Sequence, residues 1–144
     1  MAGAVSEQYA KYVGAVENRD EDALAALFAD DAVMYHPLSP EPIRRKAAII
    51  ASEQALFEAF SDINVEVRRV VAEVDDVAME VVLRATNTGP LDVGADEPRP
   101  PTGRRIELQA VWFMRLDGDG RIVEERDYLD TASFFQQLGL TGDA

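Results

Sequence analysis

The sequence contains no cysteine and only one histidine, His36. The absence of cysteine excludes a disulfide framework, a thiolate zinc site and a cysteine nucleophile. A single imidazole leaves little for a histidine-based metal cage. We therefore expect no metal site, no zinc finger and no catalytic triad.

Basic residues are also scarce, because 14 lysines and arginines stand against 27 aspartates and glutamates, for a formal net charge of −13. Such a surface repels phosphate backbones and anionic lipid head groups, so nucleic acids and membranes are poor candidate partners. Glu7 lies where a signal peptide needs a basic start and an apolar run. We expect a cytoplasmic protein.

The overall composition is that of a folded protein, with 47% hydrophobic and 28% charged residues in 144. A chain of this length is enough for one domain of ordinary size. No internal repeat and no linker divides the sequence. We expect a single domain over residues 1–144.

Helical spacing of apolar residues characterises the first third of the chain. Tyr9, Tyr12, Val13 and Val16 recur at three- and four-residue spacing after a candidate cap, Ser6. The expected elements are a helix over Ser6–Asn18, a short helix capped by Asp20 with the stripe Leu24, Leu27 and Phe28, a strand over Ala32–His36 and, after Pro37, Pro40 and Pro42, a helix over Arg44–Phe60.

From Ile63 onward the period changes to two, which predicts strands. The expected elements are a strand from Ile63 with a bulge at Val70-Val71, a turn at Asp75-Asp76, a strand over Val77–Asn87, a loop over Thr88–Gly103, strands over Arg104–Leu116 and Arg121–Leu129 joined by a hairpin turn at Asp117–Gly120, and a last short helix that starts at Thr131 or Ser133 and ends at Gly139. Helices followed by an antiparallel meander predict an α+β domain. The pair on either side of the Asp117–Gly120 turn is expected to be the longest.

Asp127 is the main candidate for chemistry. Strand alternation places Glu125 and Asp127 on the same face as Val123 and Leu129, which marks that face as inward. In a cavity, desolvation and mutual repulsion would raise the proton affinity of one carboxylate and suit it to acid/base work. The alternative is an exposed acidic edge strand paired with arginines.

Two further polar residues lie on predicted strands, and each has two interpretations. Arg84 either orients a substrate carbonyl and balances Asp127, or forms a surface ion pair with Glu80. Gln109 either hydrogen-bonds a ligand oxygen or is a polar position on the outer face.

Three further residues, one histidine and two aromatic residues, complete the candidate site. His36 titrates near neutrality and is a candidate proton relay, although a single histidine at a loop entry is more often structural. Its neighbour Tyr35 points the other way by strand parity. Trp112 is the sole tryptophan and fits the core or an interface better than a stacking platform. We count Tyr35, His36, Glu125 and Trp112 as candidate substrate-binding residues.

The chain resembles the SnoaL-like polyketide cyclases in several segments. These are VLRATNTGP at 82–90, PTGRR at 101–105, DGRIVEERDYLD at 119–130 and QLG at 137–139. The resemblance covers nearly the whole chain and implies the NTF2-like fold, shared with limonene-1,2-epoxide hydrolase and ketosteroid isomerase. That fold is a cone, in which a strongly curved, mainly antiparallel sheet wraps around about three N-terminal helices and encloses an apolar pocket.

The resemblance also implies a catalytic mechanism without a cofactor. In the cyclases, an aspartate on the last long strand removes a proton from an activated carbon, and the enolate attacks a carbonyl of the same molecule. Asp127 matches that aspartate and Gln109 matches a pocket amide, but Val111 stands where the cyclases tend to carry a histidine. Glu125 stands where relatives often have an aromatic residue.

Epoxide hydrolases of the limonene type have a similar last segment but use an Asp-Arg-Asp triad. Arg84 matches the arginine of that triad, whereas Thr86 stands where its second aspartate is expected. That difference argues against epoxide hydrolysis.

We therefore expect a cyclase of the antibiotic-biosynthesis type that acts on a bulky, oxygenated, apolar small molecule, with Asp127 as general acid/base and Arg84 or Gln109 stabilising the oxyanion. The alternatives are epoxide opening, with Glu125 and Asp127 as its two carboxyl groups, and a non-catalytic binding domain. Because Val111 and Phe113 alternate with apolar residues of the other face, we expect a homodimer through the sheet.

Overall fold

The computed structural model of the chain describes residues 2–92 and 97–140. Its helices are α1 (Ala2–Glu17), α2 (Glu21–Ala25), α3 (Lys46–Ala59) and α4 (Thr131–Gln137), and its strands are β1 (Phe28–Tyr35), β2 (Ile43–Arg44), β3 (Phe60–Glu73), β4 (Asp76–Asn87), β5 (Arg105–Leu116) and β6 (Ile122–Leu129). None of the helices in these ranges is long and apolar enough to cross a membrane.

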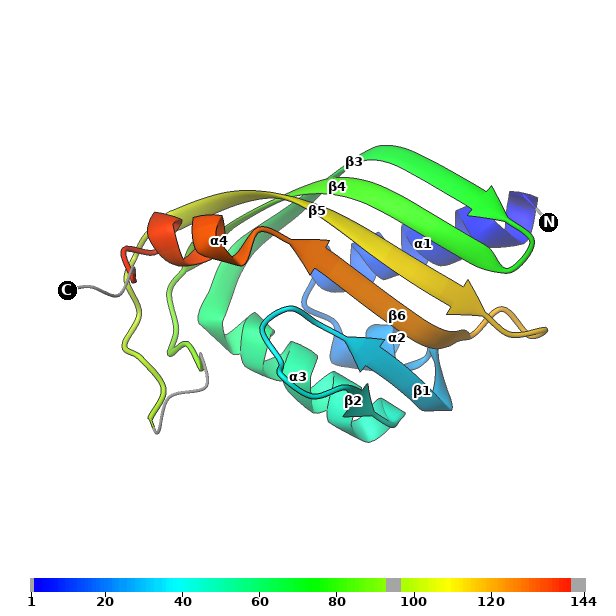
Figure 1. Cartoon of the computed structure of the whole chain (residues 1–144), viewed down its shortest axis with the longest axis horizontal. Helices are drawn as coiled ribbons and strands as arrows, with labels where there is room; N and C mark the ends of the chain where they lie inside the picture. The colour runs from blue at the N-terminus through cyan, green and yellow to red at the C-terminus, as the bar shows by residue number, and fades with distance from the viewer. Residues whose placement is uncertain (1, 93–96, 141–144) are drawn as a thin grey trace.

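The six strands form one curved, open sheet in the order β2-β1-β6-β5-β4-β3. Neighbouring strands are antiparallel except β1 and β6, which run parallel. Figure 1 shows the sheet arching over α1 and α3, with α4 beside the start of β5 and the end of β6. The α+β class and the curved sheet around N-terminal helices, expected from the sequence, are confirmed.

Alternation along β5 determines which side of the sheet is buried. Every second residue faces the helices and is at most 8% exposed: Ile106, Leu108, Ala110, Trp112, Met114 and Leu116. The residues between them point to the convex face. The same parity on β4 turns Val81 and Ala85 inward. The core therefore lies between the concave face of the sheet and the helices.

Aspartate side chains fix the starts of two helices, as expected for α2. The Asp20 carboxylate accepts a hydrogen bond from the backbone N–H of Ala23. At α4 the cap is Asp130, which accepts from the N–H of Ser133. Of the two predicted starts, Thr131 and Ser133, the first is therefore correct, because the cap precedes the first helical residue.

Some predicted element boundaries were wrong. α1 begins at Ala2, before the expected cap Ser6. Phe28 belongs to β1, not to a helical stripe, because its backbone pairs in parallel with Ile122. The pairing of β3 with β4 shifts register between Ser61 and Asn64 and between Val67 and Arg69, and the second shift lies just before the expected bulge.

The longest strand pair also differs from the prediction. β3 and β4 pair along their whole length, from Phe60↔Asn87 to Glu73↔Asp76. The predicted pair, β5 and β6, is shorter because β6 ends at Leu129, where Asp130 starts α4. The long β3–β4 ribbon supplies the curved wall opposite α1.

Asn87 is a buried polar residue that ties the end of β4 to α3. Its side-chain N–H₂ donates to the carbonyls of Ala59 (2.9 Å) and Gly89 (3.1 Å). Its Oδ1 accepts from the backbone N–H of Thr102 at 2.7 Å. The amide therefore holds together the end of α3, the end of β4 and the chain that returns to β5.

We predict that Asn87→Asp lowers the free energy of unfolding by at least about 2 kcal/mol. The substitution keeps the shape but removes both donated hydrogen bonds, and it turns a buried carboxyl toward two carbonyl oxygens. Urea denaturation at neutral pH measures the effect. Asn18→Asp makes the same change at an exposed position and should alter stability by no more than a few tenths of a kcal/mol, roughly the size expected at a helix end.

Candidate active site

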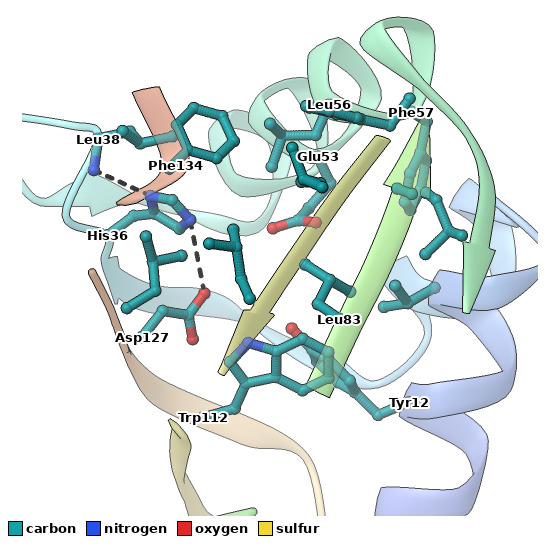
Figure 2. A pocket seen from close by; sticks show the side chains of 17 residues that line it. Tyr12, His36, Leu38, Glu53, Leu56, Phe57, Leu83, Trp112, Asp127 and Phe134 are labelled. Atoms are coloured by element: carbon teal, nitrogen blue, oxygen red, sulfur yellow. Dashed lines mark hydrogen bonds and ion pairs between the residues drawn. The ribbon is translucent and has the colours of Figure 1, made fainter. Parts of the chain in front are cut away.

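A narrow cavity of about 90 Å³ lies between the concave sheet face and helices α1 and α3. Its walls are mainly aliphatic and aromatic, with a few polar groups. The lining residues are Tyr12, Val16, His36, Leu38, Glu53, Leu56, Phe57, Phe60, Ile63, Leu83, Ala85, Ile106, Leu108, Trp112, Asp127, Leu129 and Phe134. Figure 2 shows His36, Glu53 and Asp127 pointing into the cavity among apolar side chains.

Asp127 and Glu125 both turn inward from β6, as strand parity predicted. Asp127 lines the cavity and is 8% exposed, and Glu125 lies behind it and is fully buried. The Tyr12 hydroxyl donates a 2.7 Å hydrogen bond to Glu125 Oε2. The alternative interpretation, an exposed acidic edge strand, is therefore wrong.

The two carboxyl groups of β6 behave as a pair that shares a proton. Burial raises the pKa of Asp127 well above its usual value, and the charge of Glu125 raises it further. Burial also raises the pKa of Glu125, opposed by hydrogen bonds from Asp127 and Tyr12. Among the described residues, no N–H or hydroxyl donor reaches Glu125 Oε1 or Asp127 Oδ1, and both atoms are buried. A hydrogen bond between two carboxyl groups needs a proton on one of them, so the pair is placed to hold one proton between Asp127 and Glu125.

His36 approaches this pair from the end of β1. Its Nε2 lies 3.9 Å from Asp127 Oδ2, while its Nδ1 accepts a 3.1 Å hydrogen bond from the backbone N–H of Leu38. Burial lowers the pKa of His36, so the ring is neutral at pH 7. Since Nδ1 is an acceptor, the ring proton is on Nε2 and faces Asp127.

Tyr12 and Trp112 form an aromatic wall beside the carboxyl pair. Their ring centroids are 5.4 Å apart, and the rings are tilted by 55°. Burial and the nearby charge of Glu125 raise the pKa of Tyr12 well above its usual value. The hydroxyl therefore keeps its proton and stays a hydrogen-bond donor to Glu125.

Glu53 is a third carboxyl group of the cavity, and sequence reasoning missed it. It lies on α3, is 7% exposed, and lines the cavity together with Asp127. Burial, and secondly the charge of Glu125, raises the pKa of Glu53 to about 8. The sequence contained a signal for this burial. Glu53 lies four residues after Ile49 and four before Phe57, so it shares the buried face of the helix with them.

Arg84, Gln109 and Tyr35 lie outside the cavity, contrary to the sites expected for them. The Arg84 guanidinium donates to Glu107 (2.6 Å) and Glu66 (3.0 Å) across the convex face, and Gln109 is exposed there. Tyr35 stacks under the guanidinium of Arg126, 3.9 Å from the ring centroid. Sheet parity therefore separates these side chains from Asp127, so Arg84 and Gln109 cannot stabilise an oxyanion beside it.

The carboxyl groups of the cavity do not form a metal centre. Within the described ranges, no three His, Asp or Glu side chains are grouped so that they could hold a metal ion. The arrangement instead offers proton donors and acceptors: a carboxyl pair that can exchange one proton, a neutral imidazole and a separate acid on α3.

A family model described as SnoaL-like polyketide cyclase matches residues 6–138. The chain belongs to the SnoaL-like polyketide cyclase family. Among curated proteins, no sequence matches it significantly.

Solved structures similar to this SnoaL-like chain include enzymes of more than one kind. IdmH from Streptomyces antibioticus, described as a polyketide cyclase, is 30% identical, with 93% of this chain and 97% of that one covered and a TM-score of 0.74. A SnoaL-like polyketide cyclase from Jannaschia sp. CCS1 is 20% identical (94% and 92% covered, TM-score 0.82). An LEH-like epoxide hydrolase from M. tuberculosis is 23% identical (92% and 86% covered, TM-score 0.68).

We predict that the stability of this SnoaL-like chain falls between about pH 5 and pH 8 partly because of Glu53. Its pKa is about 8 when folded against 4.5 as the ordinary value. The folded state therefore binds the proton more tightly, and this contribution is full below pH 4.5 and lost as the pH rises through 8. For a shift of this size the full loss is on the order of 5 kcal/mol.

The measurement is urea denaturation of wild type and Glu53→Gln at pH 5.5 and 8.5. Between pH 5.5 and pH 8.5 the unfolding free energy of wild type should fall more than that of Glu53→Gln. Glu58→Gln is the matched control, because Glu58 is exposed on the same helix. An equal pH response in wild type and Glu53→Gln would contradict the prediction.

Proposed function

We propose that this chain is a cofactor-free acid/base catalyst of the polyketide cyclase type, which closes a ring by an intramolecular aldol step. The observation that carries the proposal is the buried carboxyl pair of Glu125 and Asp127, of which Asp127 lines an apolar cavity and both have a raised pKa. Pairs of titratable groups in such an environment are typical of acid/base sites. The family match and the 30% identity to IdmH support the same reaction class.

The pair can act as a base although it already holds one proton. Asp127 Oδ2 accepts a proton from an activated carbon of the substrate while the proton already held by the pair goes to Glu125. The C–H electron pair becomes the double bond of an enolate, and the charge of the carboxyl pair changes from −1 to zero. The enolate carbon then attacks a second carbonyl carbon, and Asp127 returns the proton to the new alkoxide.

The substrate class follows from the size and lining of the cavity and of a groove beside it. An outer groove of about 420 Å³ shares His36, Leu38 and Leu56 with the cavity. The inner cavity alone is smaller than the usual 300–1,000 Å³, roughly, of a site for a drug-sized ligand. We propose that the reacting end of a bulky, apolar, oxygenated substrate enters the cavity and that the remainder lies in the groove.

Epoxide opening is the second enzymatic candidate and has less support. A protonated carboxyl beside a carboxylate could donate to the epoxide oxygen and activate a nucleophile. The Asp-Arg-Asp triad of the limonene type has no counterpart at the cavity, however, because Arg84 is paired with glutamates on the convex face. A non-catalytic binding role is the outcome if Asp127 proves dispensable in the experiment below.

We predict that Asp127→Asn abolishes base catalysis while leaving the fold intact. The probe is 5-nitrobenzisoxazole, a flat apolar compound whose ring opens when a base removes its C3 proton. Asparagine keeps the shape but cannot accept a proton, so the rate of ring opening should fall about a hundredfold or more. Absorbance of the released phenolate gives the rate, and quenching of Trp112 fluorescence gives binding.

Asp130→Asn is the control for this substitution. Asp130 caps α4 rather than lining the cavity, and asparagine is an equally good cap. Its rate should stay within about twofold of wild type. If Asp127→Asn opens the probe as fast as wild type while binding persists, the base is elsewhere and the enzymatic proposal fails.

The convex face of the sheet supports a second proposal, that two chains dimerise through it. Phe113 and Tyr128 are 38% and 56% exposed on neighbouring strands. Val111 lies between them, opposite Tyr128 in the β5–β6 register. Ion pairs surround this apolar centre, including Arg84 with Glu107. An apolar centre with a polar rim is the usual anatomy of a protein interface.

We predict that the wild-type chain sediments as a dimer at micromolar concentration and that Phe113→Glu sediments as a monomer. A glutamate at this position would place a charge in the apolar centre of the interface. Val74→Glu, at a turn residue that is 84% exposed, should remain dimeric. A monomeric wild-type protein at micromolar concentration would overturn the dimer proposal.

A further inference from the structure

The proposed reaction needs a hydrogen-bond donor for the substrate oxygen as well as a base. Removing a proton next to a carbonyl places negative charge on the carbonyl oxygen, and that oxygen needs a donor. Two donors of the site already point at carboxyl groups: Tyr12 donates to Glu125, and His36 Nε2 faces Asp127. Arg84 and Gln109, the donors expected from the sequence, lie on the convex face.

Glu53 is a buried acid without a partner. It is 7% exposed and lines the same cavity as Asp127, and Figure 2 shows its carboxyl group pointing from α3 into the cavity. Within the described ranges, no hydrogen bond and no cation stabilises this carboxyl; the groups that act on it are acidic. A buried polar group with no partner costs free energy unless a ligand supplies one.

The groups that face Glu53 keep it in its protonated form at neutral pH. From β6 it faces Glu125 and Asp127, which together hold one negative charge, and from α1 it faces the Tyr12 hydroxyl. The remaining titratable group of the cavity is His36, which is neutral. No positive charge therefore favours ionisation of Glu53, and its O–H remains available as a donor.

We propose that Glu53 is the proton donor of the site, and that it binds the substrate oxygen on which negative charge develops while Asp127 removes the proton. The proposal rests on the proposed function. It restricts the substrate to compounds in which an acidic C–H and an acceptor oxygen belong to one conjugated unit, such as an enolisable ketone, since one unit must contact both carboxyl groups.

In this step every proton has a defined place. The C–H proton goes to Asp127 Oδ2, and the proton already held by the carboxyl pair goes to Glu125. The C–H electron pair forms a C=C bond, the C=O electron pair moves to oxygen, and that oxygen takes the proton of Glu53. The enol carbon then bonds to the second carbonyl carbon, whose oxygen receives the proton from Asp127, and the enol O–H proton returns to Glu53.

Benzisoxazoles test the donor because their ring opening combines the same two events. A base removes the C3 proton, the N–O bond breaks, and the leaving oxygen ends as the phenol of 2-cyanophenol. Unsubstituted benzisoxazole has a poorer leaving oxygen than 5-nitrobenzisoxazole and depends more on a proton donor. Glu53→Gln should therefore slow the unsubstituted compound about tenfold more than the nitro compound.

The pH profile supplies a second readout that a structural role would not change. Wild-type activity should decline above pH 8 as Glu53 loses its proton, and this decline should be absent in Glu53→Gln. Glu53→Asp retains an acid and should restore part of the selectivity between the two probes. Glu58→Gln, exposed on the same helix, should behave as wild type.

A binding measurement tests the donor without requiring turnover. Wild type should bind 2-cyanophenol more tightly than benzonitrile, which lacks the oxygen, and Glu53→Gln should lose most of this preference in a Trp112 fluorescence titration. An unchanged preference or an unchanged ratio of probe rates in Glu53→Gln overturns the role of Glu53. If Asp127→Asn opens the probes as fast as wild type, the proposed base is wrong, but the binding result for Glu53 still tests its role as donor.

Discussion

The low polarity of the space between the sheet and the helices limits how much negative charge it can hold. Glu53, Glu125 and Asp127 enter this space without a lysine or arginine among the residues that line it. Like charges a few ångströms apart repel far more strongly there than in water. Protons must therefore remain on most of these groups at neutral pH, and the site is an acid/base site because of where it is buried.

The fold makes this burial tolerable by providing hydrogen bonds for the single charge. Tyr12 from α1 donates to Glu125 Oε2, and Asp127 from the same strand lies beside Glu125 as its carboxyl neighbour. The curvature of the sheet brings α1 and β6 close enough for the 2.7 Å contact with Tyr12. Asn87 fixes the end of α3, the helix that carries Glu53.

The sequence predicted the features that depend on local periodicity. Alternation identified the inward pair Glu125 and Asp127, because flanking apolar residues marked that face of β6. It could not identify the inward face of β4 in the same way, since Val81 and Val82 are both apolar and both buried. Arg84 therefore could not be assigned to the concave or the convex side until the register with Glu107 was known.

Sequence periodicity could not predict contacts between residues that meet only through tertiary packing. Glu53 is an interruption in an apolar helical stripe, and a single interruption in such a stripe does not reveal that β6 lies opposite. Tyr12 was predicted as a core residue of the first helix, but its hydrogen bond to Glu125 joins positions 113 apart in the chain. Contacts of this kind depend on how α1 and the sheet are arranged in three dimensions.

The parity of β5 also determines where the side chain at position 111 points. Position 111, where the resemblance led us to expect a relay histidine, shares the convex parity of Gln109 and Phe113. A histidine there would point away from Asp127, so valine at this position removes no polar group from the cavity. His36 reaches Asp127 from the end of β1 instead, and the backbone N–H of Leu38 orients its ring. The imidazole beside the base therefore comes from a parallel neighbour of β6, where the chain leaves the sheet, and its orientation depends on the Pro37 turn rather than on strand alternation.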